Sequence, residues 1–315
     1  MSKRIKTAWL ILKETYTDFT NNKSLRMSAA LAYYTVFSIA PILIVIISLC
    51  DVFYGKAAIE GTIYGHIKTF VGSDTALQIE EIIRNATTSK KASWASVVGV
   101  ISLLIAATGV FGEIQDSINQ IWRLKAKPRK GWLKIIVNRM LSFSMLISIG
   151  FILLVSLVIN SVLDFLSGQL SGFISYQAVY ATSLINISIT FVTVSLLFGV
   201  IFKILPDARI KWRDITVGAI ATAVLFMIGK FAIGVYLGNS NIRDSYGAAS
   251  SIIVLLLWVY YSAAILYFGA TFTRVYAQNK GRNIYPNDYA VWVKEVELEN
   301  KESIQSAKNE NDVVL

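Results

Sequence analysis

The sequence is poor in charged residues, cysteine and histidine. Charged residues make up 16% of the 315 positions, whereas a soluble domain typically has about 25%. The single cysteine, Cys50, excludes an internal disulfide and a zinc site made of several cysteines. The single histidine, His66, leaves little basis for histidine-dependent catalysis. These scarcities argue against a soluble enzyme, and we expect neither a cofactor nor a metal centre.

Apolar residues, by contrast, make up 55% of the chain and fall into long runs. A membrane-spanning helix needs about 20 mostly apolar residues. We therefore predict an all-α, polytopic integral membrane protein with six transmembrane helices. Their expected bounds are 28–50, 94–114, 136–162, 179–205, 215–238 and 247–273. We expect no signal peptide, because no small-residue cleavage site follows a short apolar core near the N-terminus.

The net charge of +10 is concentrated in alternate segments. Of the 30 Lys and Arg residues, 23 fall in residues 1–26, 115–139, 203–213 and 274–315. With six spans these segments share one side, so the positive-inside rule predicts that both termini are cytoplasmic. There the basic segments would attract anionic lipid headgroups. We expect no nucleic-acid binding, because no basic face interleaved with exposed aromatic residues stands out. An oligomer is compatible with the sequence.

Segments outside the spans also show helical patterns. Residues 1–26 are expected to form a cytoplasmic interfacial helix, because apolar side chains recur at helical spacing over 4–19. Within the membrane domain, 27–276, the external loop 51–93 is expected to be partly helical. The last segment, 277–315, is expected to be an acidic cytoplasmic tail with a short helix at most after Pro286, followed by disorder.

A proline lies inside the first predicted span. Pro41 removes one backbone donor and leaves the carbonyl of Phe37 without its helical partner. In a bilayer a neighbouring helix, water or Ser38 must satisfy that carbonyl. A packed kink is the commoner explanation. The alternative is a hinge or widened site in the middle of the membrane, which makes Pro41 and Ser38 candidate residues of a substrate or ion pathway.

Polar side chains inside the other spans are candidates for a substrate or ion pathway. Lys230 lies several residues inside an apolar run, where an ionisable group marks a functional site by default. Alternatively, its side chain extends to the outer interface. Asn186 and Thr190, one turn apart in the fourth span, either hydrogen-bond between helices or line a cavity.

Charges near the cytoplasmic ends of the spans form a second candidate group. Glu113 and Asp116 lie one turn apart, and they could pair with Arg123, Lys203 or Arg274. Paired carboxylates can also carry out acid–base chemistry. An interfacial ion pair is the more common arrangement, so we interpret these five residues as gate charges.

Four segments, in their order and spacing, resemble the YihY/virulence factor BrkB family, whose members were also labelled ribonuclease BN. They are RMSAALAYYTVFSIAPILIV at 26–45, INQIWRLK at 118–125, LPDARIKWRDITVGA at 205–219 and YGAASSIIVLLLWVYYSAAILYFGATFTRVYA at 246–277. The resemblance covers about residues 20 to 280. It implies a six-helix protein of the bacterial inner membrane with a suspected transport role and no settled substrate.

The sequence departs from this family at one position and gives no support to the nuclease label. The family commonly has an acid after Gly-Ala in the last helix, where this chain has Thr271. Metal-dependent nucleases need clustered histidine and carboxylate ligands. This chain has one histidine, and its acidic residues are scattered outside the tail. Ribonuclease activity is therefore an unlikely function, and we expect no enzyme.

We predict a membrane transporter or translocator of a lipid or another amphipathic, anionic substrate. The basic cytoplasmic segments, the interfacial helix and the intramembrane Lys230 are the basis. The sequence contains no GxxxxGK[ST] phosphate-binding loop, so movement would be passive, ion-coupled or driven by a partner. A non-transporting scaffold or envelope assembly factor is the alternative. An ion channel is a third hypothesis, which no ring of charge supports.

Overall fold

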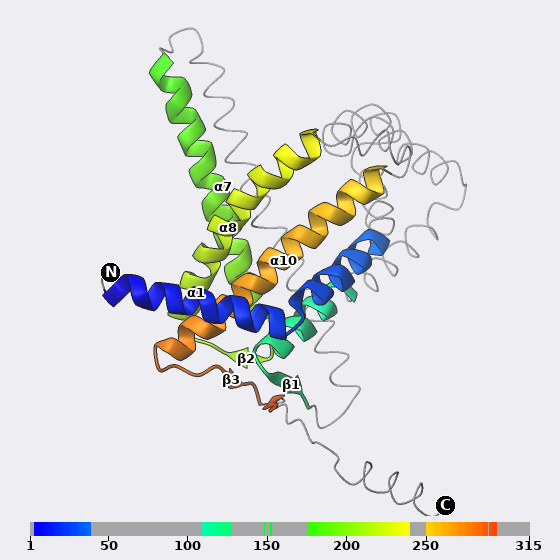
Figure 1. Ribbon diagram of the computed structural model, residues 1–315, viewed down its shortest axis with the longest axis vertical. Coiled ribbons are helices and arrows are strands. Elements are labelled where there is room, and N and C mark those ends of the chain that lie inside the picture. Colours follow the sequence, from blue (N-terminus) through cyan, green and yellow to red (C-terminus); the bar gives the residue numbers. More distant parts are fainter. Residues whose placement is uncertain are drawn as a thin grey trace, which may run out of the picture.

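The computed structural model describes residues 3–38, 109–127, 148, 152, 176–239, 250–288 and 290–294 (Figure 1). Most of these residues are helical. The three longest helices are α7 (Tyr176–Ile204), α8 (Trp212–Asn239) and α10 (Ser250–Asn279). Within them, Ile187–Ile204, Trp212–Ile233 and Ile252–Asn279 are long and apolar enough to cross a membrane. These helices agree with the predicted spans 179–205, 215–238 and 247–273.

The first two predicted spans are described only in part. Residues 24–38 are helical and cover the start of span 28–50. Residues 109–121 form a helix that covers the end of span 94–114 and continues seven residues beyond it. The remainder of both spans, the external loop 51–93 and all but residues 148 and 152 of span 136–162 lie outside the described residues. The prediction of six spans therefore remains a prediction.

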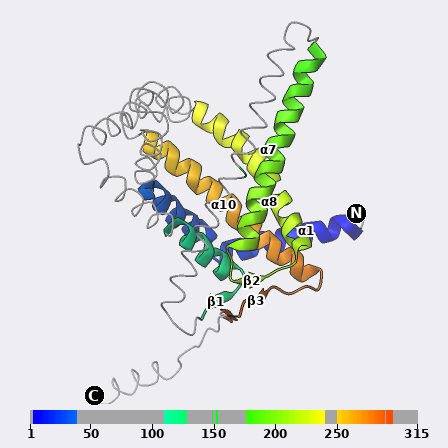
Figure 2. The same cartoon turned by 180° about the vertical axis from the view of Figure 1, so that it is seen from behind.

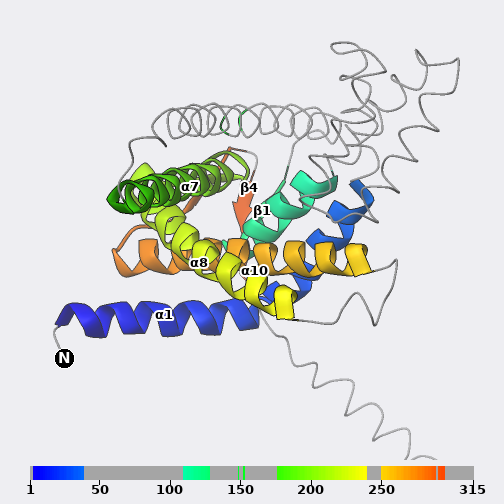
Figure 3. The ribbon, with the colours of Figure 1, turned by 90° about the horizontal axis from the view of Figure 1, so that it is seen from above.

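The long helices pack in sequence order, with α8 in contact with both α7 and α10. Helix α1 (Lys3–Asn21) lies across the C-terminal half of α10 (Figure 1). Seen from above, α7 and α1 lie on opposite sides of α10 (Figure 3). Three helix ends meet near α1, namely the C-terminal ends of α7 and α10 and the N-terminal end of α8 (Figure 1). We call this region the α1 end.

The amphipathic pattern predicted for residues 4–19 does form a helix, α1. One face, with Ile11 and Thr15, is buried against the bundle. The other face leaves a row of large apolar side chains exposed, namely Ile5, Trp9, Leu12 and Tyr16. Such an arrangement is typical of a helix that lies in a membrane interface.

Four short strands join distant segments at the α1 end, with β1, β2 and β3 labelled in Figures 1 and 2 and β4 in Figure 3. Strand β1 (Leu124–Ala126) pairs antiparallel with β4 (Ala290–Trp292), with Lys125 opposite Val291. Strand β2 (Ala208–Arg209) pairs antiparallel with β3 (Tyr285–Pro286). The sequence predicted no strands.

The prediction of a short helix at most after Pro286 is wrong for residues 290–292, which form β4. This segment finds backbone partners on β1 instead of forming its own helical hydrogen bonds. The neighbouring Val293 N–H donates to the carbonyl of Arg123 at 2.9 Å, and Trp292 Nε1 donates to the carbonyl of Ile284 at 3.0 Å.

The core is concentrated at the α1 end. Its fully buried side chains include Ile118, Ile121, Phe202, Ile215 and Tyr267, from four different helices. Farther along α7 and α8, large apolar side chains such as Leu196, Ile228 and Phe231 are exposed. Exposed apolar side chains on long apolar helices are expected where the helices face lipid rather than water.

Candidate polar site at the α1 end

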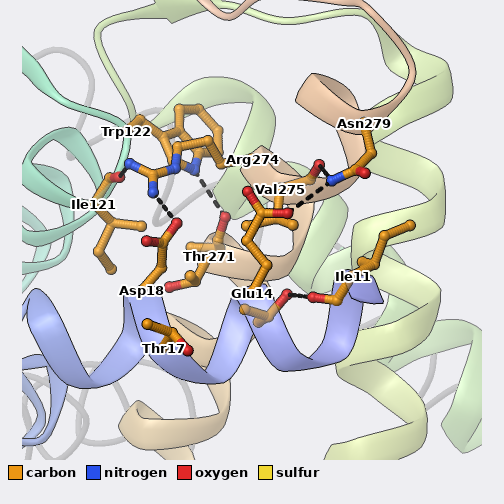
Figure 4. Close-up of polar contacts among 12 residues, drawn as sticks. Ile11, Glu14, Thr17, Asp18, Ile121, Trp122, Thr271, Arg274, Val275 and Asn279 are labelled. Carbon is orange, nitrogen blue, oxygen red and sulfur yellow. Dashed lines mark hydrogen bonds and ion pairs between the residues drawn. The ribbon is translucent and has the colours of Figure 1, made fainter. Parts of the chain in front are cut away.

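Arg274 of α10 is the centre of a polar network that links three helices (Figure 4). Its side chain is 3% exposed. Nη1 donates to the carbonyl of Ile121 at 2.6 Å, and Nη2 forms an ion pair with the Asp18 carboxylate of α1. Asn279 Nδ2 adds a hydrogen bond to Glu14 Oε2 of α1 at 3.0 Å. Because a buried guanidinium is costly without a partner, the ion pair with Asp18 stabilises Arg274, whose Nε makes no hydrogen bond, and fixes α1 against α10.

The indole of Trp122 contributes a second link between the helix at 109–121 and α10. Trp122 is 3% exposed, and its Nε1 donates to the carbonyl of Ala270 at 2.9 Å (Figure 4). That carbonyl lies one helical turn before Arg274. The turn of α10 from 270 to 274 is therefore held from two directions.

A second network surrounds Asp207, in the short connection between α7 and α8. The side chain of Asp207 is 2% exposed. Gln115 Nε2 donates to Oδ1 and Asn119 Nδ2 donates to Oδ2, both at 2.9 Å. Asn119 Oδ1 in turn accepts the backbone N–H of Asp207 at 2.9 Å. These bonds tie the α7–α8 connection to the helix at 109–121. They satisfy a buried carboxylate for which the described part of the chain provides no ion pair.

A pocket of about 940 Å³ opens beside these networks. It lies between the end of α1, the end of the helix at 109–121, and strands β1 and β4. Its lining is mostly polar and consists of Asp18, Asn21, Asn22, Asp116, Asn119, Gln120, Arg123, Leu124, Lys125, Ala126, Val293 and Lys294.

The pocket has an excess of positive charge. The charge of Asp18 is matched by Arg274, which lies outside the lining. The other charged lining residues are three basic side chains, Arg123, Lys125 and Lys294, and one acidic side chain, Asp116. Hydrogen-bonding amides next to basic side chains suit an anionic polar group such as a phosphate.

The five predicted gate charges do not form a single group. Asp116 and Arg123 both line the pocket, and Arg274 lies next to it through Asp18. Glu113 is half-buried and accepts a hydrogen bond from Ser117 Oγ at 3.3 Å. Lys203 lies apart from the pocket lining, where Nζ donates to the carbonyl of Ile210 at 2.8 Å and lies 5.4 Å from the centre of the Trp212 ring.

The pathway residues predicted within the spans are placed separately. Lys230 is exposed on α8, 18 residues after Trp212, which corresponds to roughly 27 Å along the helix. This depth fits a lysine that reaches the far interface, and a functional role remains a prediction. Thr190 is half-buried on α7, and Asn186 belongs to the same helix.

Ser38 donates to a backbone carbonyl other than that of Phe37, for which the sequence offered it as a partner, and its role in a pathway remains a prediction. It is 3% exposed, and its Oγ donates to the carbonyl of Tyr34 at 2.7 Å. Pro41 lies outside the described residues, so the choice between kink and hinge remains open.

Thr271, at the position where the resemblance led us to expect an acid, is fully buried. Its Oγ1 donates to the carbonyl of Tyr267 at 2.8 Å, within the same helix. An acid at this position would lie one turn before Arg274. In this chain the carboxylate that binds Arg274 belongs to Asp18 of α1.

Sequence reasoning missed four residues of these networks, namely Asp18, Asp207, Asn119 and Gln115. Asn119 and Asp207 do occur in two of the quoted segments, INQIWRLK and LPDARIKWRDITVGA. Their position in those segments could have identified them as candidate site residues. The sequence could not show that they are in contact, because Asn119 and Asp207 are 88 positions apart in the chain. Within the part of the chain that the structure describes, no group of three His, Cys, Asp or Glu side chains could hold a metal ion.

Comparison with known proteins gives consistent matches over most of the chain. The family model described as virulence factor BrkB matches residues 15–289. A UPF0761 membrane protein of Alteromonas mediterranea is 27% identical over 77% of this chain and 79% of its own length. A UPF0761 membrane protein of Mannheimia succiniciproducens is 26% identical over 84% of this chain and 89% of its own length. One of Stenotrophomonas maltophilia is 27% identical over 80% of this chain but only 57% of its own length. No solved structure matches the chain.

Proposed function

The chain belongs to the virulence factor BrkB family of bacterial membrane proteins, and on that premise we propose that it is a transporter or translocator of an anionic, amphipathic substrate such as a lipid. The pocket at the α1 end carries this proposal. It combines about 940 Å³ of space with amide donors and an excess of basic side chains. An anionic headgroup fits such a lining, because charge-assisted hydrogen bonds to Arg and Lys are strong.

The surroundings of the pocket support an amphipathic substrate rather than a small soluble anion. Helix α1 contributes Asp18 and Asn21 to the lining, and Asn22 follows directly after the helix. Its opposite face exposes a row of large apolar side chains. A helix with this pattern binds at the level of the headgroups and the first acyl carbons. The pocket would then open where lipid headgroups are present.

The proposal includes a topology. The protein has six spans in the bacterial inner membrane, with both termini and the α1 end in the cytoplasm. The basic residues of segments 1–26, 115–139, 203–213 and 274–315 support this orientation. Anionic headgroups of the cytoplasmic leaflet are the expected partners of these segments. We propose no enzymatic activity and no nucleic-acid partner.

A scaffold or envelope assembly factor is the second candidate, favoured by one surface. Strand β4 lies at the edge of its two-stranded sheet, and Val291, Trp292 and the adjacent Val293 are exposed. An exposed apolar edge strand is suited to pairing with another chain. A scaffold would use this edge and would not need the pocket.

The test is lipid translocation in proteoliposomes, with labelled anionic and zwitterionic lipids. We expect the wild type to move anionic lipid faster, and the Lys125→Gln/Lys294→Gln double variant to lose that preference. Each basic residue attracts an anionic surface by about 1 kcal/mol, so the preference should fall roughly ten- to thirtyfold.

Lys211→Gln is the matched control, because Lys211 is exposed at the same end but does not line the pocket. It should retain the wild-type preference. If the folded wild type moves neither lipid faster than empty liposomes do, passive lipid translocation is wrong. If movement is seen but the double variant keeps its anionic preference, the pocket is not the headgroup site.

A further inference from the structure

The helix at 109–121 ends in a left-handed turn at the edge of the pocket. Arg123 has a φ of 58° in this turn, a backbone conformation that glycine adopts readily and other residues adopt only at a cost. The end of α10 shows the usual choice, because Gly281 has a φ of 67° at the corresponding place. A charged residue therefore occupies a position of the turn that glycine would fill without strain.

Main-chain hydrogen bonds on both sides hold this turn. The Arg123 N–H donates to the carbonyl of Gln120 at 3.0 Å, and the Arg123 carbonyl accepts the N–H of Val293 at 2.9 Å. Strand β1 begins at the next residue, Leu124, and pairs with β4. None of these bonds uses the arginine side chain, so the turn itself gives no reason for arginine at this position.

A second basic residue with a left-handed backbone provides a comparison within the same molecule. Lys23, after the end of α1, has a φ of 53° and is exposed. A basic side chain at the C-terminal end of a helix interacts favourably with the last carbonyl groups, and this applies equally to Lys23 and Arg123. Arg123 lines the pocket of about 940 Å³, however, and Lys23 does not. The position in the pocket lining, together with the backbone conformation, distinguishes Arg123.

A guanidinium group in this lining suits a phosphate group. Its N–H donors lie in one plane and match two oxygen atoms of a phosphate. No acidic side chain in the described part of the chain forms an ion pair with Arg123. The amides of Asn21, Asn22 and Gln120 and two lysines add further donors to the lining. Because these donors outnumber the two oxygens of a carboxylate, they favour a phosphate over a carboxylate.

We propose that Arg123 binds the phosphate group of the substrate in this pocket. The left-handed backbone is retained at a residue other than glycine because the side chain is needed for binding, and the strain is the cost of that site. The assignment rests on the proposed function, since it names the substrate group that the pocket recognises and the residue that recognises it. A lipid headgroup and inorganic phosphate share this chemistry, and the experiment distinguishes them.

The test is isothermal titration calorimetry of the full chain in maltoside micelles and phosphate-free buffer, with thermal unfolding measured in parallel. The two probes are inorganic phosphate and dihexanoyl phosphatidate. We expect the wild type to bind at least one probe, and Arg123→Gly to bind it about ten- to hundredfold more weakly, because charge-assisted hydrogen bonds are lost. The unfolding midpoint of Arg123→Gly should equal or exceed that of the wild type, since glycine relieves the left-handed conformation.

Lys23→Gly is the matched control, because it removes a basic side chain and a left-handed non-glycine residue outside the pocket lining. It should bind the probe nearly as tightly as the wild type does. Arg123→Lys keeps the charge and the backbone strain but loses the planar pair of donors. We expect its affinity to lie between those of the wild type and Arg123→Gly.

The assignment is wrong if the wild type binds neither probe, if Arg123→Gly binds as tightly as the wild type, or if Lys23→Gly weakens binding equally. Binding of phosphatidate through Arg123 supports a lipid headgroup as the source of the phosphate. Binding of inorganic phosphate alone supports the site and counts against a lipid.

The outcome is distinguishable from that of the liposome assay, because binding is measured and not movement. Binding through Arg123 in a protein that moves no lipid would support the assignment and count against the proposed translocation. Lipid movement by the wild type, together with unchanged binding by Arg123→Gly, would overturn the assignment and leave the translocation standing.

Discussion

A single amide side chain, that of Asn119, connects two distant segments at the residue scale. It accepts the backbone N–H of Asp207 and donates to the carboxylate of the same residue, both at 2.9 Å. Both residues are almost completely buried. Because both partners are buried, although Asn119 borders the pocket, the loss of these bonds leaves polar groups of Asp207 poorly solvated.

We predict that Asn119→Ala destabilises the protein by about 2–6 kcal/mol. The substitution leaves the buried N–H and one carboxylate oxygen of Asp207 unsatisfied, and each such group costs about 1–3 kcal/mol. The measurement is the free energy of unfolding of the purified protein in mixed micelles, titrated with a denaturing detergent.

Asn283→Ala is the matched control, because Asn283 is exposed at the same end of the molecule. Exposed substitutions of this kind usually change the free energy of unfolding by less than about 0.5 kcal/mol. Equal effects of the two substitutions would contradict the structural role of Asn119.

At the scale of elements, α8 and α10 approach each other through two reciprocal pairs. Gly218 of α8 faces Thr273 of α10, and Thr222 of α8 faces Gly269 of α10. A Cβ atom at Gly218 would lie 1.9 Å from Thr273 Oγ1, and one at Gly269 would lie 1.9 Å from Thr222 Oγ1. Small residues at such positions let membrane helices pack closely.

The threonines of these pairs keep their hydroxyl groups satisfied within their own helices. Thr222 Oγ1 donates to the carbonyl of Gly218 at 2.6 Å, and Thr273 Oγ1 donates to the carbonyl of Gly269 at 2.7 Å. The contact between helices is therefore one of shape, with no hydrogen bond required across it.

We predict that Gly218→Ala destabilises the protein by about 1–3 kcal/mol, because the added methyl group overpacks the contact with Thr273. Adding Thr273→Ala should recover part of the loss, since it removes the atom nearest to the new methyl group. The measurement is the same detergent titration, applied to the single and double variants.

Gly112→Ala is the control at a helical glycine with open space, because nothing lies within 4 Å of a Cβ built there. It should be neutral or stabilise by up to about 1 kcal/mol, since glycine is a poor residue inside a helix. A destabilisation by Gly112→Ala as large as that by Gly218→Ala would show that the effect is not specific to the α8–α10 contact.

At the scale of the whole molecule, the proposed topology places the α1 end in the cytoplasm. Two single-cysteine variants test this in a Cys50→Ser background. Asn283→Cys marks the α1 end, and Asp74→Cys marks the loop predicted to be external. In spheroplasts, a membrane-impermeant maleimide should label Asp74→Cys directly and Asn283→Cys only after lysis.

Labelling of Asn283→Cys in intact spheroplasts would overturn the cytoplasmic assignment of the α1 end. Labelling of both sites after lysis is the control for accessibility. The outcome depends on which side faces the medium and not on transport, so it tests the orientation independently of the proposed function.

The sequence by itself determined the membrane class, three of the spans, the helix at the N-terminus and the family resemblance. These follow from local properties, because the length and polarity of a run decide whether it can reside in a bilayer. Family membership came from motifs in order, which are likewise read along the chain. The three helices found at the predicted positions 179–205, 215–238 and 247–273 confirm this part.

Only the tertiary structure decided which polar groups meet. Asp18 and Arg274 form an ion pair although they are 256 residues apart in the chain. Strand β1 pairs with β4, in a tail segment for which the sequence predicted at most a short helix. Periodicity could place Asp18 on a polar position of α1, but it could not choose among the many basic residues for its partner. That choice depends on how the helices cross and which charges become buried together, because desolvation makes pairing necessary only once the chain has folded.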